Sequence, residues 1–188
     1  MATLQIHQIP CLQDNYGYLI HDPASGLTAS VDTPDAAAIE RALTEHGWKL
    51  DYILNTHHHF DHAGGNLALK AKSGCVVVGS RADAARIPGI DVLVGEGDRF
   101  SLGAHEARIL ETSGHTVGHI CYVFDHDKAA FVGDTRKQQQ VVRAEFHRHS
   151  LSLRRNNVIQ SNVFRIDFGT TKVCASVPPD RPPPGAPS

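Results

Sequence analysis

The chain has 188 residues, of which 41% are hydrophobic and 20% charged, and its formal net charge is −2. This composition is typical of a globular domain with room for a sizeable core, and it excludes both a disulfide-stapled mini-protein and a disordered chain. No apolar run reaches the length of about 18–20 residues that a membrane helix needs, and Met1–Asp22 lacks the features of a secretory signal. We therefore expect no membrane partner and a cytoplasmic location.

Charge is unevenly distributed along the chain. Residues 1–135 contain 9 Lys and Arg against 17 Asp and Glu, whereas residues 136–188 contain 9 against 3. Six of the ten prolines lie within Pro178–Pro187, and eleven of the thirteen histidines precede Thr135. We therefore divide the chain into an acidic, His-rich domain over residues 1–135 and a basic tail over residues 136–188, which we expect to be partly disordered at its Pro-rich end.

The first part of the chain alternates between strand and helix patterns. Short β-branched and aromatic runs separated by turn residues predict strands, and the first three of these runs predict an antiparallel meander. The strands are expected at Leu4–Ile9, Tyr16–His21, Leu27–Val31, Tyr52–Asn55, Cys75–Gly79, Ala107–Glu111, His119–Phe124 and Ala129–Val132. Helical stretches are expected near Gly65–Ala71 and Arg81–Arg86, and one further strand-like stretch, Asn162–Phe168, lies in the tail.

A longer helix is predicted to begin at Thr33-Pro34-Asp35. Thr33 can cap it, Pro34 fits the first turn, and Asp35 suits the positive end of the helix dipole. Gly47 is positioned to end this helix. Antiparallel strands mixed with strand–helix units indicate an α/β (α+β) architecture of two sheets with helices packed outside them.

The strongest chemical signal is the run Asn55-Thr56-His57-His58-His59-Phe60-Asp61-His62 beyond the end of a predicted strand. His57 and His59 are two residues apart and can point to the same side, toward one metal ion. Asp61 and His62 follow as a helix begins, and they supply a carboxylate and an imidazole for a second ion. These ligand types without thiolate suit zinc, and also iron or manganese. A solvated His-rich loop is the alternative interpretation.

Two later segments favour the metal interpretation. His115 lies in Thr112-Ser113-Gly114-His115-Thr116-Val117-Gly118-His119, after a predicted strand, and Asp134 follows another strand in Phe131-Val132-Gly133-Asp134-Thr135. In this order, the two histidine runs and the later Asp resemble the metallo-β-lactamase superfamily, whose members build a binuclear metal site. The resemblance implies a four-layer αββα sandwich, which this chain would leave incomplete at its C-terminal side.

Within that superfamily the chain is similar to glyoxalase II, the hydroxyacylglutathione hydrolases. The similarity covers residues 1–135 and also rests on Ile9-Pro10-Cys11-Leu12-Gln13-Asp14-Asn15-Tyr16-Gly17-Tyr18-Leu19-Ile20. It implies that one metal ion is held by His57, His59 and His115, and a second by Asp61 and His62, with Asp134 bridging the two. Two zinc ions are expected, with iron or manganese as alternatives.

The resemblance also implies a reaction. Two divalent ions that share a water lower its pKa from about 15.7 toward 7, so that a hydroxide can attack the thioester of S-lactoylglutathione and release lactate and glutathione. Asp61 and Asp134 are the carboxylates expected to take part in catalysis. His58 is expected to point away from His57 and His59 as a structural residue, and His119 to be either a core residue or a partner that orients a ligand.

The resemblance ends after Thr135. The tail has neither the Gly-His-Glu metal ligand nor the glutathione-binding helical domain of the family. We do not expect His147 or His149 to replace the missing metal ligand. The second metal ion should therefore bind more weakly than the first. A nucleic-acid partner is not expected, because the tail has no Arg-rich helix pattern and few aromatic residues. Two alternatives to a glutathione thioesterase therefore stay open: another hydrolase of the same fold, or a non-catalytic metal-binding chain.

Overall fold

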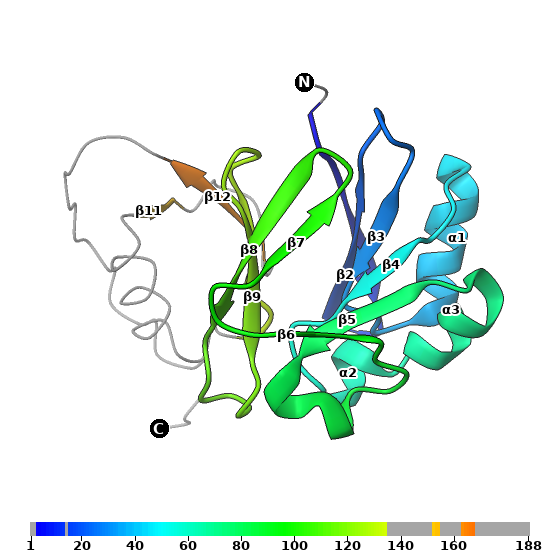
Figure 1. Cartoon of the computed structure of the whole chain (residues 1–188). Helices are drawn as coiled ribbons and strands as arrows, with labels where there is room; N and C mark the ends of the chain where they lie inside the picture. Colours follow the sequence, from blue (N-terminus) through cyan, green and yellow to red (C-terminus); the bar gives the residue numbers. More distant parts are fainter. Residues whose placement is uncertain (1–2, 14, 135–151, 155–162, 168–188) are drawn as a thin grey trace, which may run out of the picture.

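The structure is a computed structural model of the chain, and it describes residues 3–13, 15–134, 152–154 and 163–167. Two six-stranded sheets face each other, and helices cover the outer face of the first sheet (Figure 1). In spatial order the first sheet contains β1 (Gln5–Cys11), β2 (Asn15–His21), β3 (Thr28–Val31), β4 (Tyr52–Leu54), β5 (Val76–Ser80) and β6 (Val92–Val94). The second contains β11 (Ser152–Arg154), β12 (Val163–Asp167), β10 (Ala129–Phe131), β9 (Ile120–Phe124), β8 (His105–Glu111) and β7 (Arg99–Leu102).

The connections follow from the local sequence. Strands β1, β2 and β3 form the predicted antiparallel meander. Strands β3 to β6 are parallel, and helices connect them as parallel strands require. These helices are α1 (Ala36–His46), α2 (Phe60–Ala63), α3 (Asn66–Ser73) and the 3₁₀ helix η1 (Arg81–Arg86). The mixed α/β architecture of two sheets with outer helices is therefore confirmed.

Side-chain alternation along the strands of the first sheet creates two cores. Tyr18 and Ile20 face the second sheet and pack with residues such as Phe131, whereas Leu19 faces α1 and packs with Ile39. All of these side chains are buried. Because successive strand residues point to opposite faces, one sheet supplies both the layer between the sheets and the layer under the helices.

The start of α1 differs from the prediction. The capping residue is Asp35, whose side chain accepts a hydrogen bond from the Ala38 amide at 3.1 Å, and not Thr33. Thr33 is instead buried, and its hydroxyl donates to Asn66 Oδ1 at 2.6 Å. Asp35 and Thr33 are equally good caps by residue type, so the tertiary contact of Thr33 decides between them. Gly47 ends the helix in the left-handed conformation, as predicted.

Several other expectations can be compared with the structure. The predicted tail strand is confirmed, since β12 pairs antiparallel with β10 and with β11. Strands β6, β7 and β11 were not predicted. Within the described part of the chain, no helix is long and apolar enough to cross a membrane. The Pro-rich end at 178–188, His147 and His149 lie outside the described residues.

Candidate metal centre

The predicted ligands come together at one end of the two sheets, the lower end in Figure 1. The carboxyl ends of parallel strands meet at one edge of a sheet, where α/β proteins place ligand sites. The segments that follow β3, β4 and β5 therefore start at this edge of the first sheet. The second sheet contributes the segments after β8 and β10, which run in the same direction because both are antiparallel to β9.

Two clusters of potential ligands share one histidine. In the first, ligand atoms of His57, His59 and His115 all lie within 4.8 Å of one another. In the second, the same is true of His57, His62 and Asp134. Asp134 lies between the clusters, because its Oδ1 is 3.3 Å from His62 Nε2 and its Oδ2 is 3.4 Å from His115 Nε2. The shared position of His57 was not predicted.

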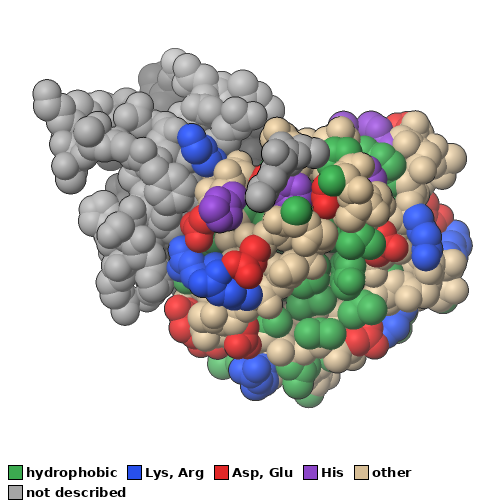
Figure 2. All heavy atoms as spheres, turned by 45° about the horizontal axis from the view of Figure 1, so that its top comes forward, with side chains coloured by type: hydrophobic (Ala, Val, Ile, Leu, Met, Phe, Trp, Pro, Cys, Tyr) green, Lys and Arg blue, Asp and Glu red, His purple; other side chains and the backbone are tan. Residues whose placement is uncertain are grey.

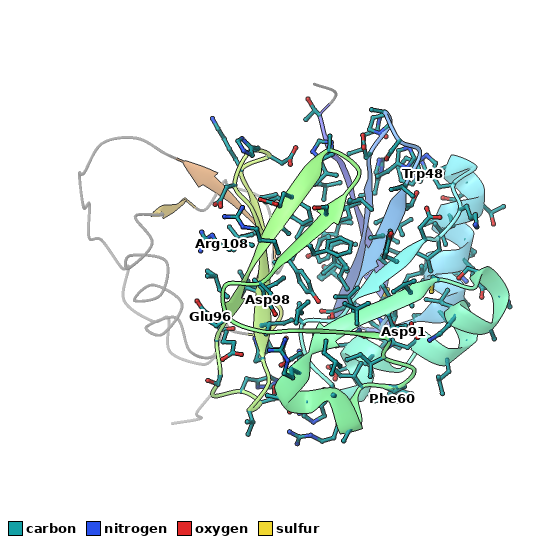
Figure 3. The ribbon with its side chains drawn as sticks, in the orientation of Figure 1. Trp48, Phe60, Asp91, Glu96, Asp98 and Arg108 are labelled. Carbon is teal, nitrogen blue, oxygen red and sulfur yellow. The ribbon has the colours of Figure 1, made fainter. Side chains whose placement is uncertain are left out.

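Asp61 occupies a different position from the other predicted ligands. Its Oδ2 lies 3.8 Å from His62 Nε2, but among the described residues it belongs to neither cluster. The Asp61 side chain is 53% exposed, and its backbone carbonyl accepts a hydrogen bond from Asn15 Nδ2 at 2.6 Å. The neighbouring Phe60 is 80% exposed and extends from the lower end of the fold (Figure 3). The carboxylate of Asp61 therefore lies on the solvent side of the site.

A buried carboxylate behind the site sets the tautomers of two histidines. Asp32 Oδ2 accepts hydrogen bonds from His62 Nδ1 and from the Thr56 hydroxyl, both at 2.8 Å, and Asp32 Oδ1 accepts from the Thr56 amide. Since the Thr56 hydroxyl donates its hydrogen to Asp32, its oxygen can only accept from His57 Nδ1, at 3.1 Å. In their neutral form, which is the form that binds a metal, both histidines then carry their hydrogen on Nδ1 and present the Nε2 lone pair.

The donor atoms at this site fit a metal ion. In the described part of the chain, Nε2 of His57, His62, His115 and His119 is buried and makes no well-formed hydrogen bond, although Asp134 oxygens lie 3.3 Å from His62 Nε2 and 3.4 Å from His115 Nε2. Leaving such a group unsatisfied costs about 1–3 kcal/mol each, so several together at one point are unfavourable unless something binds them. Imidazole and carboxylate groups without thiolate are ligands for zinc, iron or manganese. The chain therefore has a metal-binding site.

The pKa values of the predicted histidine ligands shift in opposite directions. Burial, with the positive potential of neighbouring histidines, lowers the pKa of His57 far below its usual value and also lowers that of His59. Burial opposes the charged form of His62 as well, but Asp32 and Asp134 outweigh it and raise the pKa of His62 to about 10. His57 and His59 are therefore neutral, the form that binds metals, whereas a proton and a metal ion compete for His62 Nε2.

Two further histidines adjoin the site. His58 Nδ1 bonds Asp83 Oδ2 at 2.8 Å, and in the described residues His58 belongs to neither ligand cluster. His119 is fully buried, its Nδ1 bonds the Thr112 hydroxyl at 2.8 Å, and its ring stacks against that of His57 at 4.9 Å between centroids. Burial lowers the pKa of His119 to about 4. His119 is therefore a neutral residue that packs against a predicted ligand.

Asp32 and Asp83 were not found from the sequence. Asp32 follows β3 just as the histidine run follows β4, and its φ of +56° is unusual for a residue other than glycine. A polar residue at a strand end was the available signal for Asp32, but the neighbouring Thr33-Pro34-Asp35 indicated a helix start instead. Asp83 lies inside η1 and carries no comparable signal.

Comparison with known proteins identifies related sequences. A family model described as the metallo-beta-lactamase superfamily matches residues 17–166. A hydroxyacylglutathione hydrolase of Maricaulis maris is 56% identical over 135 residues, which is 72% of this chain and 53% of the relative. The protein of the same name from Methylococcus capsulatus is 54% identical over 70% of this chain and 52% of its own length. The chain thus spans about half the length of these curated relatives.

Solved structures share the fold. The ETHE1 protein of Myxococcus xanthus matches with a TM-score of 0.59 and 30% identity, over 70% of this chain and 57% of that protein. The B3 metallo-beta-lactamase BLEG-1 matches with a TM-score of 0.64 over 76% of this chain and 84% of that protein, at 21% identity. At that lower identity the match supports the fold alone.

Proposed function

Because the chain belongs to the metallo-β-lactamase superfamily, we propose that it is a metal-dependent thioester hydrolase of the hydroxyacylglutathione hydrolase type. The observation that carries this proposal is the pair of ligand clusters that share His57, with Asp134 between them. The names of the relatives at 54–56% identity support a hydroxyacylglutathione as the substrate. A fold alone does not choose among the chemistries it can host, so the substrate depends on these relatives.

We propose two zinc ions as the cofactor, with iron or manganese as substitutes. One ion would be held by His57, His59 and His115. The other would be held by Asp61 and His62, with Asp134 bridging. The exposed position of Asp61 supports a second site that binds more weakly than the first.

The reaction adds water to the acyl carbon of the thioester and breaks its C–S bond, giving a carboxylic acid and a thiol. When bound, a divalent ion polarises a carbonyl oxygen and lowers the pKa of water from about 15.7 toward 7. Asp134 would orient the attacking water, and the place of its carboxylate between His62 and His115 supports this role. Asp61 would be the second carboxylate that takes part in catalysis. Because a thiolate is a good leaving group, no strong general acid is required.

The remaining expectations about the chain stay predictions. The division at Thr135 is one of them, and strands β11 and β12 from the second part extend the second sheet beside β10. A cytoplasmic location is another. We propose a small glutathione thioester as the partner, and no nucleic acid.

The test is hydrolysis of S-lactoylglutathione by the full chain, with bound metal measured on the same sample. Turnover that is lost on chelation and restored by zinc would support the proposal. Two bound ions without turnover would contradict it, and cleavage of a β-lactam or of another ester instead would assign the chain to a different activity of the superfamily. Asp134→Ala should abolish turnover. The control is Asp98→Asn, which changes a carboxylate outside both ligand clusters whose side chain is 44% exposed, and it should leave turnover unchanged.

A further inference from the structure

Asp83 is a buried carboxylate outside both ligand clusters. It lies in η1, and its side chain has no solvent exposure. His58 Nδ1 donates to its Oδ2 at 2.8 Å, and Arg86 donates to its Oδ1. Burial alone would raise the pKa of Asp83, but these two hydrogen bonds and the nearby Thr116 hydroxyl hold it below its usual value. A charge without solvent is tolerated only when it is paired in this way.

Apart from Arg86, which lies in η1 itself, the residues that contact the Asp83 side chain belong to the two loops that carry the predicted ligands. His58 lies between His57 and His59 in the loop after β4. Gly118 belongs to the loop after β8, and a Cβ atom at Gly118 would lie 2.6 Å from Asp83 Cγ and 2.8 Å from the Asp83 amide nitrogen. This loop therefore packs directly on Asp83, which requires glycine at position 118. Thr116 lies beside the same carboxylate but does not reach hydrogen-bond geometry.

We propose that Asp83 is a positioning residue that holds these two loops together, so that His59 and His115 reach the same metal ion. The inference rests on the metal-binding role proposed above, but not on the thioesterase activity. Asp83 acts through His58 and through the backbone at Gly118, and it does not itself touch the ion.

The geometry explains why this link matters. His59 and His115 lie in loops that follow strands of different sheets, β4 and β8. Their rings meet edge to face, with 4.7 Å between the centroids. The bonds from Ile120 N to Thr56 O, at 2.9 Å, and from the Tyr122 hydroxyl to Asn55 O, at 3.1 Å, join the two segments where they meet their strands. Asp83 adds a link farther along both loops, through His58 and Gly118. A link next to the ligands restrains the loops where the bonds at the strand ends do not, and displaced ligands bind a metal ion less tightly.

The test compares Asp83→Asn and Asp83→Ala with Asp22→Asn as the matched control. As a whole residue Asp22 is as buried as Asp83, and it accepts hydrogen bonds from the Ser25 hydroxyl and the Ala24 amide, away from both metal-ligand loops. Zinc affinity is measured by chelator competition and the unfolding free energy of metal-free protein by urea titration. The absorption spectrum of the cobalt-loaded protein reports ligand geometry, and none of these measurements needs a substrate.

Loss of a residue that orients metal ligands typically weakens metal affinity about 10–100-fold. We expect a loss in this range for Asp83→Ala, a smaller loss for the isosteric Asp83→Asn, and a shifted cobalt spectrum in both. Asp22→Asn should keep the wild-type affinity and spectrum even where it loses as much stability. Unchanged affinity and spectrum in both Asp83 variants would overturn the proposal, as would an equal loss of affinity in Asp22→Asn.

His58→Ala tests the same link without changing the buried carboxylate, which keeps the proposal testable if the Asp83 variants fold poorly. It should weaken zinc binding by about tenfold or less, and the double variant with Asp83→Ala should lose no more than Asp83→Ala alone. Full additivity of the two losses would contradict a role of Asp83 through His58. A wild-type chain that binds zinc but shows no turnover would contradict the proposed function while leaving this inference open to the same measurements.

Discussion

Gly133 offers a sharp test of how the second sheet supports the site. It has a φ of +47°, and a Cβ atom there would lie 2.5 Å from the Thr56 hydroxyl oxygen and 2.8 Å from His119 Nε2. Gly133→Ala therefore combines two costs: about 1–2 kcal/mol for a left-handed alanine and about 1–3 kcal/mol for overpacking. The total is about 2–5 kcal/mol of unfolding free energy.

Gly26→Ala is the matched control for this substitution. Gly26 has a φ of +75°, and a Cβ atom there would meet nothing within 4 Å, so alanine should cost only the backbone strain of about 1–2 kcal/mol. Urea titration of the metal-free variants gives both free energies. Because the Thr56 hydroxyl accepts from His57 Nδ1, its displacement should also weaken zinc binding about 10–100-fold in Gly133→Ala alone. Equal stability losses and equal zinc affinities in the two variants would refute the reasoning.

The remaining predictions concern the ligands, the metal and pH. In metal analysis at saturating zinc, His59→Ala and Asp134→Ala should abolish the bound metal while His58→Ala keeps most of it; equal loss in all three would contradict the proposed roles. Chelation should lower the melting temperature, with about 2.7 kcal/mol of stabilisation lost when free zinc had been at 100 times its dissociation constant; no shift would argue against binding to the native state. Burial would raise the pKa of Asp22, but the Ser25 hydroxyl and two backbone amides hold that pKa below its ordinary value of 3.8. The ionised form therefore stabilises the fold above that value, and this contribution is lost as the pH falls through the lower folded pKa. Asp22→Asn should then lose less unfolding free energy than the wild type between about pH 5 and pH 3, and identical acid profiles would contradict this assignment.

Local sequence determined most of the secondary structure. Strand alternation and turn residues act over a few positions, which is why the opening meander and the helix end at Gly47 could be predicted. Strands β6 and β7 were missed because they are short and partly exposed, as Val92 and Leu93 illustrate. The cap of α1 was also misassigned. Both Thr33 and Asp35 are good capping residues by type, and the hydrogen bond of Thr33 to Asn66, which joins distant parts of the chain, leaves the cap to Asp35.

The predicted ligands could be found in the sequence because each follows a strand in a recognisable motif. Their mutual placement could not be found there. Tertiary structure makes His57 common to two clusters, places Asp134 between them and leaves Asp61 toward solvent. It also brings Asp32 and Asp83 behind the histidines, where each accepts a hydrogen bond from a ring Nδ1. In Figure 2, where the end of the fold opposite these ligands comes forward, the histidines lie at separate places among acidic, basic and hydrophobic side chains. The residue types of a metal site can be recognised in short stretches of sequence. The geometry of the ligands depends on how the two sheets pack, and it is decided only when the chain folds.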